Sequence, residues 1–400
     1  MRTMAFQIAL LAMLLFGAID ISRGLAAPMM QSDWNITYWQ LGIAFSANSF
    51  GYVVSSFASG MILHRVGLRR AIVTGALLSA AGLLGLAWRH EFALVVLGFL
   101  VYGVGSGVLE IGINGVVPAL AGDTPSTSLF NLLHGLYGAG AFGFPVVAVW
   151  LMGRLHGWRP LYALLAMGLL CVWLLGTLTK HPVLRRTATD AVERAPDGAA
   201  PRARRAGSLY RSPLLYVLLV AITAYVMAEA AVCGWLPTYL VHARNVSLDS
   251  SSLCLSGFYL TFTAGRLTAP LWVQRAGRYR ALLFSVCLAL VAFCCALWVG
   301  WPIPLFIAAG AGFAIVFPTI AAVASDMFRA EAGVVIGVLY TAAGFGSMML
   351  NALIGWLSSR FGIGVGFSTT ALFLCVVLAC TWLAQKVAPP HREAAAPMVS

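Results

Sequence analysis

Five charged residues lie inside long apolar stretches of this chain: Asp20, Arg23, Glu110, Glu229 and Arg266. A charge at the middle of a hydrocarbon layer costs about 2.5–3.5 kcal/mol on insertion scales. Only 10% of the 400 residues are charged, so this small set stands where a charge is most expensive. Such side chains normally face the interior of a helix bundle or a water-filled path, where they bind polar solutes or carry protons.

The spacing of these residues indicates which of them can pair. Asp20 and Arg23 are three residues apart, on one face of a helix, so they can form an ion pair that is either structural or functional. Arg266 lies eight residues before the next loop motif, about 12 Å along a helix. It is too deep to reach the surface easily, so it must meet an acid, a backbone carbonyl or an anionic substrate.

Three acids against two arginines leave one carboxyl group over. A carboxyl group buried without a charged partner favours its neutral form, and it can release a proton when its surroundings change. We therefore expect proton coupling at Glu110 first, with Glu229 next and Asp20 as a further candidate. A permanently protonated glutamate in a structural hydrogen bond is the alternative.

Other polar and aromatic side chains in the apolar stretches are candidate substrate contacts. Asn114 is one turn beyond Glu110, and Asn131 shares a helix face with His134. These supply hydrogen-bond donors and acceptors, although a hydrogen bond between helices would use them equally well. The full set that we expect to bind substrate is Arg266, Arg23, Asn114, Asn131, His134, Tyr137 and Trp235.

The elements that carry these residues are apolar runs long enough to cross a membrane. The chain is 60% hydrophobic with a mean hydropathy of +0.89, which excludes an ordinary soluble domain. About 20 apolar residues in a helix span the hydrocarbon layer. We predict an all-α polytopic membrane protein with twelve such helices, at 6–28, 38–63, 71–88, 92–120, 127–152, 160–179, 213–241, 251–273, 281–299, 303–325, 332–358 and 363–386. The first is expected to be a retained helix rather than a signal peptide.

The net charge of +12 reflects topology and not nucleic-acid binding. With the N-terminus inside, eighteen Lys or Arg fall in inside segments and five in outside loops. This bias predicts that both termini are cytoplasmic, in a bacterial inner (plasma) membrane. The Arg-rich segment 180–212 reads as a cytoplasmic linker.

The two halves of the chain repeat one another around this linker. Residues 60–70 read Gly-Met-Ile-Leu-His-Arg-Val-Gly-Leu-Arg-Arg, and residues 270–280 read Pro-Leu-Trp-Val-Gln-Arg-Ala-Gly-Arg-Tyr-Arg. Duplicated halves with a site between them are a recurring transporter design. We expect two pseudo-symmetric six-helix bundles at 1–179 and 213–388, with a cytoplasmic tail at 389–400.

The loop repeated in the two halves resembles the signature between helices two and three of the major facilitator superfamily. The resemblance implies a gating function for Arg65, Gly67, Arg69, Arg275, Gly277 and Arg278. The alternative is that these arginines only anchor the loops on the cytoplasmic side. The family usually has an acid where this chain has His64 and Gln274, so the charge latch that this acid serves is in question. Residues 103–114, Gly-Val-Gly-Ser-Gly-Val-Leu-Glu-Ile-Gly-Ile-Asn, are similar to the fourth helix of fucose-permease-like sugar:proton symporters.

We therefore expect a proton-coupled transporter that takes up a small polar solute, sugar-like or an organic acid, by alternating access. A proton-driven efflux antiporter for an amphipathic compound is the alternative, and a non-transporting membrane sensor is a remote one. No nucleophile–base pair or metal-ligand spacing points to an enzyme or a metal site. We expect no cofactor besides the proton gradient, no nucleic-acid partner and a monomer among membrane lipids.

Overall fold

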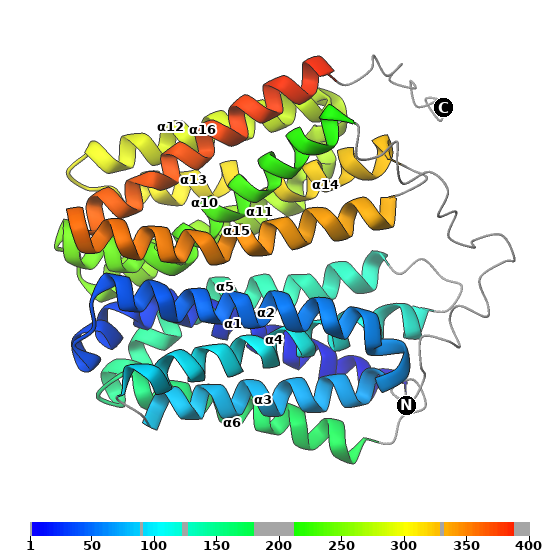
Figure 1. Ribbon diagram of the computed structural model, residues 1–400, viewed down its shortest axis with the longest axis vertical. Coiled ribbons are helices and arrows are strands. Elements are labelled where there is room, and N and C mark those ends of the chain that lie inside the picture. Colours follow the sequence, from blue (N-terminus) through cyan, green and yellow to red (C-terminus); the bar gives the residue numbers. More distant parts are fainter. Residues whose placement is uncertain (1, 89–90, 122–126, 180–211, 329–331, 388–400) are drawn as a thin grey trace, which may run out of the picture.

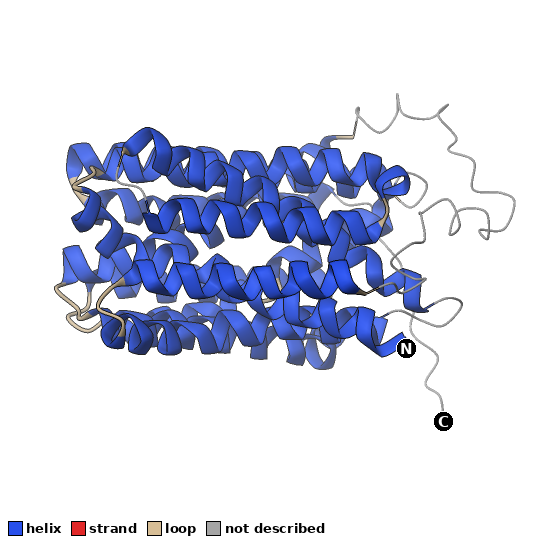
Figure 2. Ribbon diagram, turned by 90° about the horizontal axis from the view of Figure 1, so that it is seen from below, coloured by secondary structure: helices blue, strands red, loops and turns tan. Residues whose placement is uncertain are grey.

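The computed structural model describes residues 2–88, 91–121, 127–179, 212–328 and 332–387, and these ranges are helical with short connecting turns (Figure 2). The helices run side by side in two groups, α1 to α6 and α10 to α16, drawn one above the other in Figure 1. The predicted linker, apart from Ser212, and the predicted tail lie outside these ranges.

The first group has six long helices. Helix α4 packs on α2 and α3, while α1 packs on α5 and α3 on α6. Their bounds are α1 Arg2–Trp34, α2 Tyr38–Val66, α3 Leu68–Trp88, α4 Phe92–Ala121, α5 Thr127–Arg154 and α6 Trp158–Leu178.

The second group repeats this plan with one difference. Its helices are α10 Pro213–Arg244, α11 Leu248–Ala276, α12 Arg278–Trp298, α13 Ile303–Phe313, α14 Val316–Met327, α15 Ala332–Phe361 and α16 Ile363–Val387. The tenth predicted span is thus two helices with a turn at Ala314 and Ile315, where we expected one. Pro318 explains the break, because it has no N–H to donate to the carbonyl of Ala314 four residues earlier.

All twelve predicted spans are therefore confirmed as helical. Eleven helices or helix pairs in the described ranges are long and apolar enough to cross a membrane, with α13 and α14 counted as one span. Helix α11 is not among them, although its 29 residues give it the necessary length. Its Ser and Thr residues, together with Arg266, lower its apolar character.

The two groups contact one another at one end of the bundle. We call this the far end, where α2 begins and α15 finishes; the motif end is the opposite one, where residues 64–70 and 274–280 lie. At the far end a methyl group added to Gly42 of α2 would lie 2.5 Å from the carbonyl oxygen of Asn351 in α15. Nearer the motif end, neither Gly60 of α2 nor Gly337 of α15 has such a neighbour within 4 Å. Close contacts between α2 and α15 therefore run from the far end to mid-depth, where a methyl group added to Gly344 would lie 2.3 Å from the Val53 side chain, and none is found at Gly60 or Gly337.

Candidate functional site

The first part of the site is a polar cluster on α1, α2 and α5. The Arg23 guanidinium donates to a carboxylate oxygen of Asp20 and to the side-chain oxygen of Asn48. The other Asp20 oxygen accepts from the Tyr137 hydroxyl at 2.9 Å. The predicted Asp20–Arg23 ion pair is therefore confirmed, and a tyrosine from another helix completes the shell of its carboxylate.

Glu110 on α4 meets a neutral partner instead of an arginine. The Tyr52 hydroxyl of α2 donates to its carboxyl group, and no arginine or lysine nitrogen in the described residues lies within 4.0 Å of it. Asp20 acts on Glu110 electrostatically, as a like charge. Glu110 therefore has a hydroxyl group, and not a cation, as its hydrogen-bond partner.

The second half contributes Glu229 on α10 and Arg266 on α11. The two side chains interact electrostatically, and the Tyr225 hydroxyl lies beside both. The Nε–H of Arg266 donates to the carbonyl of Ala314 at 3.0 Å. That carbonyl is available because Pro318 cannot donate to it, so the turn between α13 and α14 forms part of the site.

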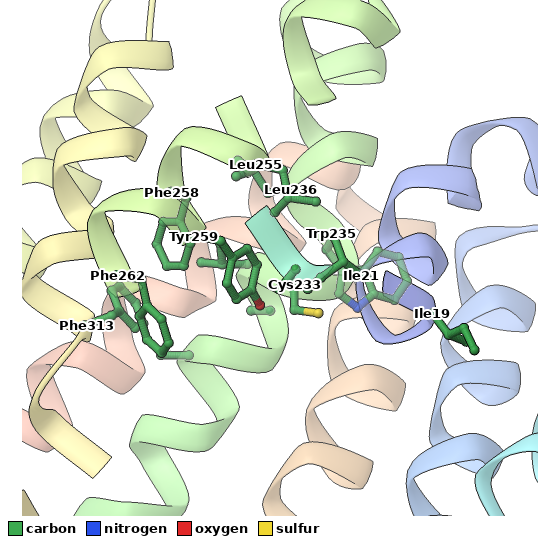
Figure 3. Close-up of a cluster of buried hydrophobic side chains, with 14 of the residues drawn as sticks. Ile19, Ile21, Cys233, Trp235, Leu236, Leu255, Phe258, Tyr259, Phe262 and Phe313 are labelled. Atoms are coloured by element: carbon green, nitrogen blue, oxygen red, sulfur yellow. The ribbon is translucent and has the colours of Figure 1, made fainter. Parts of the chain in front are cut away.

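Arg266 packs against a cluster of aromatic side chains through the ring of Phe262. Its guanidinium carbon lies 4.1 Å from the centroid of the Phe262 ring, a distance at which a cation is attracted to the face of the ring. Phe262 packs in turn against Phe258 and Tyr259, and Phe258 against Phe313. These four rings are buried. Phe258, Phe262 and Phe313 lie together where α11 meets α13, whereas the Tyr259 ring points towards Cys233 of α10 (Figure 3). They hold Arg266 in place without being open to a solute themselves.

Arg266 faces the space between the halves. Helices α5 and α11 still touch at Gly138, where an added methyl group would lie 3.2 Å from the Thr263 hydroxyl. One turn nearer the motif end, Gly135 has no such neighbour. Arg266 lies at this level and is exposed, and it interacts electrostatically with His134 and Tyr340 of the facing helices.

The remaining predicted substrate contacts are distributed unevenly. His134 is exposed and faces Arg266. Asn114 is half-buried, and its buried side-chain oxygen has no hydrogen-bond partner in the described residues. Trp235 is 0% exposed and lies at the junction of the halves, where its indole donates to Asn351 at 3.0 Å. Asn131 belongs to α5, but its side chain is outside the described part.

The two motif loops use their basic residues differently. Gly67 and Gly277 both have φ of +82°, which side chains other than glycine rarely adopt. Arg69 donates to the carbonyls of Gly176 and Thr177 at the end of α6. Arg278 instead pairs with Asp326 at the end of α14. Arg65 and Arg275 are exposed, and the side chains of His64 and Gln274 are outside the described part.

The sequence analysis did not find several uncharged hydrogen-bond partners of the site residues, because it selected mainly charged residues within the apolar spans. Asn48 and Tyr52 are polar residues within one apolar span, and that pattern could have marked them as partners of Arg23 and Glu110. Asn351 carries the same signal in α15. In the described residues no group of three or more His, Cys, Asp and Glu side chains could hold a metal ion.

The helices, the duplicated loops and the polar residues between two halves define a membrane transporter of the secondary class. A family model described as Major Facilitator Superfamily matches residues 8–302 and 218–399. The chain belongs to this superfamily, so it is an integral membrane protein and not an enzyme.

Known proteins similar to this chain cover nearly all of it. A "Protein TsgA homolog" of Yersinia pseudotuberculosis serotype O:1b (strain IP 31758) is 20% identical over 380 residues, 93% of each chain. A bacterial homologue of the human lysosomal transporter Spinster, inward-facing and unoccupied, has a TM-score of 0.77 at 12% identity and covers 98% of this chain and 99% of its own. A D-xylose-proton symporter has a TM-score of 0.75 at 16% identity, with 98% and 99% covered.

FucP, in the outward conformation, has a TM-score of 0.61 at 19% identity, covering 95% of this chain and 98% of its own. The expected likeness to fucose permeases therefore holds at the level of a shared fold. Because these solved structures differ in what they are named for, the fold alone does not select a substrate.

Proposed function

We propose that this protein is a proton-coupled symporter that takes up a small polar solute by alternating access. The observation that carries the proposal is the set of three carboxyl groups on α1, α4 and α10, of which Glu110 has a neutral hydroxyl partner. A carboxyl group that served only packing would be paired or replaced by an apolar side chain, because an unpaired buried charge is costly.

In this proposal Glu110 carries the coupled proton, and the motif end is the cytoplasmic end, as the distribution of Lys and Arg favours. The lack of close contacts at Gly60 and Gly337 then supports an inward-open state. Asp20 and Arg23 remain paired through the cycle in this proposal.

The test is a substrate-dependent pH change in proteoliposomes, with D-xylose, succinate and an aromatic carboxylate as a first panel. Symport predicts that protons move with the solute; protons moving against it would support the antiporter. Glu110→Gln keeps the shape of the side chain but holds no proton, so we expect gradient-driven accumulation to be lost and solute exchange to persist.

Glu91→Gln is the matched control, because Glu91 is exposed just before α4 and the same charge is removed. If Glu110→Gln accumulated solute against a gradient as the control does, the proton would have to be carried elsewhere.

A further inference from the structure

Arg266 has more hydrogen-bond donors than the described residues use. A guanidinium has five N–H donors in a flat fork, and the backbone takes only the Nε–H, through Ala314. Arg266 forms no ion pair within 4.0 Å among the described residues. The Tyr225 hydroxyl, which donates to the carbonyl of Phe313 at 2.9 Å, also interacts with Arg266 and with Glu229. An exposed guanidinium with open donors, at mid-depth in a membrane protein, is suited to an anion from solution.

The surroundings of Arg266 favour a carboxylate on an apolar or aromatic body. One side of the guanidinium is covered by the Phe262 ring, which leaves the rest for planar, two-pronged recognition of the kind that carboxylates allow. Tyr340 of α15 is 49% exposed and interacts electrostatically with Arg266. It therefore faces the same space and offers its ring to the body of the solute.

The charges that face Arg266 determine when an anion can enter. Glu229 of α10 is the acid that acts on it, whereas Asp20 of α1 is held by Arg23. Among the described residues, His134 of α5 also interacts electrostatically with Arg266. While Glu229 is ionised, it neutralises Arg266 and repels a second carboxylate; once Glu229 takes up a proton, Arg266 attracts one.

We propose that Arg266 binds the carboxylate of an organic acid with an aromatic or apolar body, and that Glu229 takes up one proton when this anion binds. The inference rests on the proposed symport and names its substrate class. The empty site holds one negative and one positive charge; the occupied site holds a neutral Glu229, Arg266 and one anion. Both states have the same net charge, so binding adds no uncompensated charge inside the membrane.

The test is titration calorimetry on the purified, full-length protein with 3-phenylpropionate, its neutral amide 3-phenylpropionamide, and D-xylose. Titrations at one pH in buffers of different ionisation enthalpy give the number of protons taken up per anion. We expect one proton for the unaltered protein and none for Glu229→Gln, which should still bind the anion. Arg266→Gln should weaken anion binding at least ten-fold and Arg266→Lys less, because lysine keeps the charge but loses the fork.

Arg154→Gln is the control for charge, since Arg154 is exposed at the end of α5 and lies over the ring of Trp150. Anion binding without proton uptake would overturn the assignment to Glu229, and absent or equally tight binding of acid and amide would overturn the carboxylate site. Binding of D-xylose alone, with a proton-coupled signal in proteoliposomes, would refute this inference and leave the symport intact. No proton-coupled flux with any solute would refute the symport itself.

Discussion

Replacement of Gly42 by alanine tests whether close backbone contact at the far end holds the halves together. A Cβ on Gly42 would lie 2.5 Å from the carbonyl oxygen of Asn351 and 3.0 Å from the Cα of Gly355. Real Cβ atoms do not approach backbone this closely, so α2 and α15 would have to move apart. Because both contacts join one half to the other, the strain falls on the state that is closed at the far end.

The magnitude follows from the cost of overpacking. Forcing an extra methyl group into a tight contact costs about 1–3 kcal/mol, which shifts a two-state equilibrium by roughly 5- to 150-fold. Gly60→Ala is the matched control, because Gly60 is on the same helix and has no heavy atom within 4 Å of an added Cβ. Both changes gain the same helix propensity, about 1 kcal/mol, so the difference isolates the contact.

The assay uses a cysteine that the chain already has. Cys233 of α10 is 6% exposed, and its carbonyl packs against Gly24 of α1, so opening of the far end should uncover it. We expect a membrane-impermeant thiol reagent, added from the far-end side, to label Gly42→Ala faster than Gly60→Ala by a factor within that range. Cys233→Ser supplies the background from the other cysteines. Equal labelling of the two alanine variants would refute the reasoning.

Two further predictions concern polar contacts within and between the halves. Asp20→Asn removes the acid of the Asp20–Arg23 pair and should lower the free energy of unfolding by about 3–5 kcal/mol, because Arg23 is left with an uncompensated charge. Adding Arg23→Gln should recover part of this loss, measured by thermal unfolding of the detergent-purified protein. Strictly additive losses would contradict the pairing. Asn351→Leu should cost about 1–3 kcal/mol by leaving the buried indole N–H of Trp235 without an acceptor. Trp235→Phe should then cost less in the Asn351→Leu protein than in the unaltered one, because it removes the unpaired N–H. Equal costs in the two backgrounds would show that the indole bond is not the cause.

The twelve spans could be predicted because membrane burial leaves a strong, simple signal in the sequence. Each helix must satisfy its own backbone and present apolar side chains to lipid, so length and hydropathy suffice for all of the spans except α11, whose Ser and Thr residues and Arg266 weaken the signal. The Asp20–Arg23 pair could also be predicted, because its spacing along one helix fixes the geometry. The contacts between helices could not, because helix rotation and tilt decide whether Tyr52 or an arginine meets Glu110.

The broken tenth span shows a different limit. Pro318 was visible in the sequence, but apolar length alone treats residues 303–325 as one helix. Pro318 leaves the carbonyl of Ala314 without its helical donor, and this carbonyl becomes part of the site because Arg266 donates to it. Arg266 belongs to another helix, 48 residues earlier in the chain. The proline is a local feature of the sequence, whereas the contact between Ala314 and Arg266 depends on how the helices pack and cannot be found in a local pattern.

The hydrogen bond from Arg266 to the carbonyl of Ala314 bears on the count of three acids and two arginines from which proton coupling was inferred. Arg23 has its acid, while Arg266 directs its Nε–H to a neutral backbone carbonyl and keeps only an electrostatic interaction with Glu229. Glu110, with a tyrosine hydroxyl as partner and Asp20 as a like charge nearby, is the carboxyl group left over. Two carboxyl groups can then act separately: Glu110 exchanges the proton that drives transport, and Glu229 governs whether Arg266 is free for an anion. If that division is right, Glu110→Gln and Glu229→Gln must fail differently, the first in accumulation and the second in the proton count of binding.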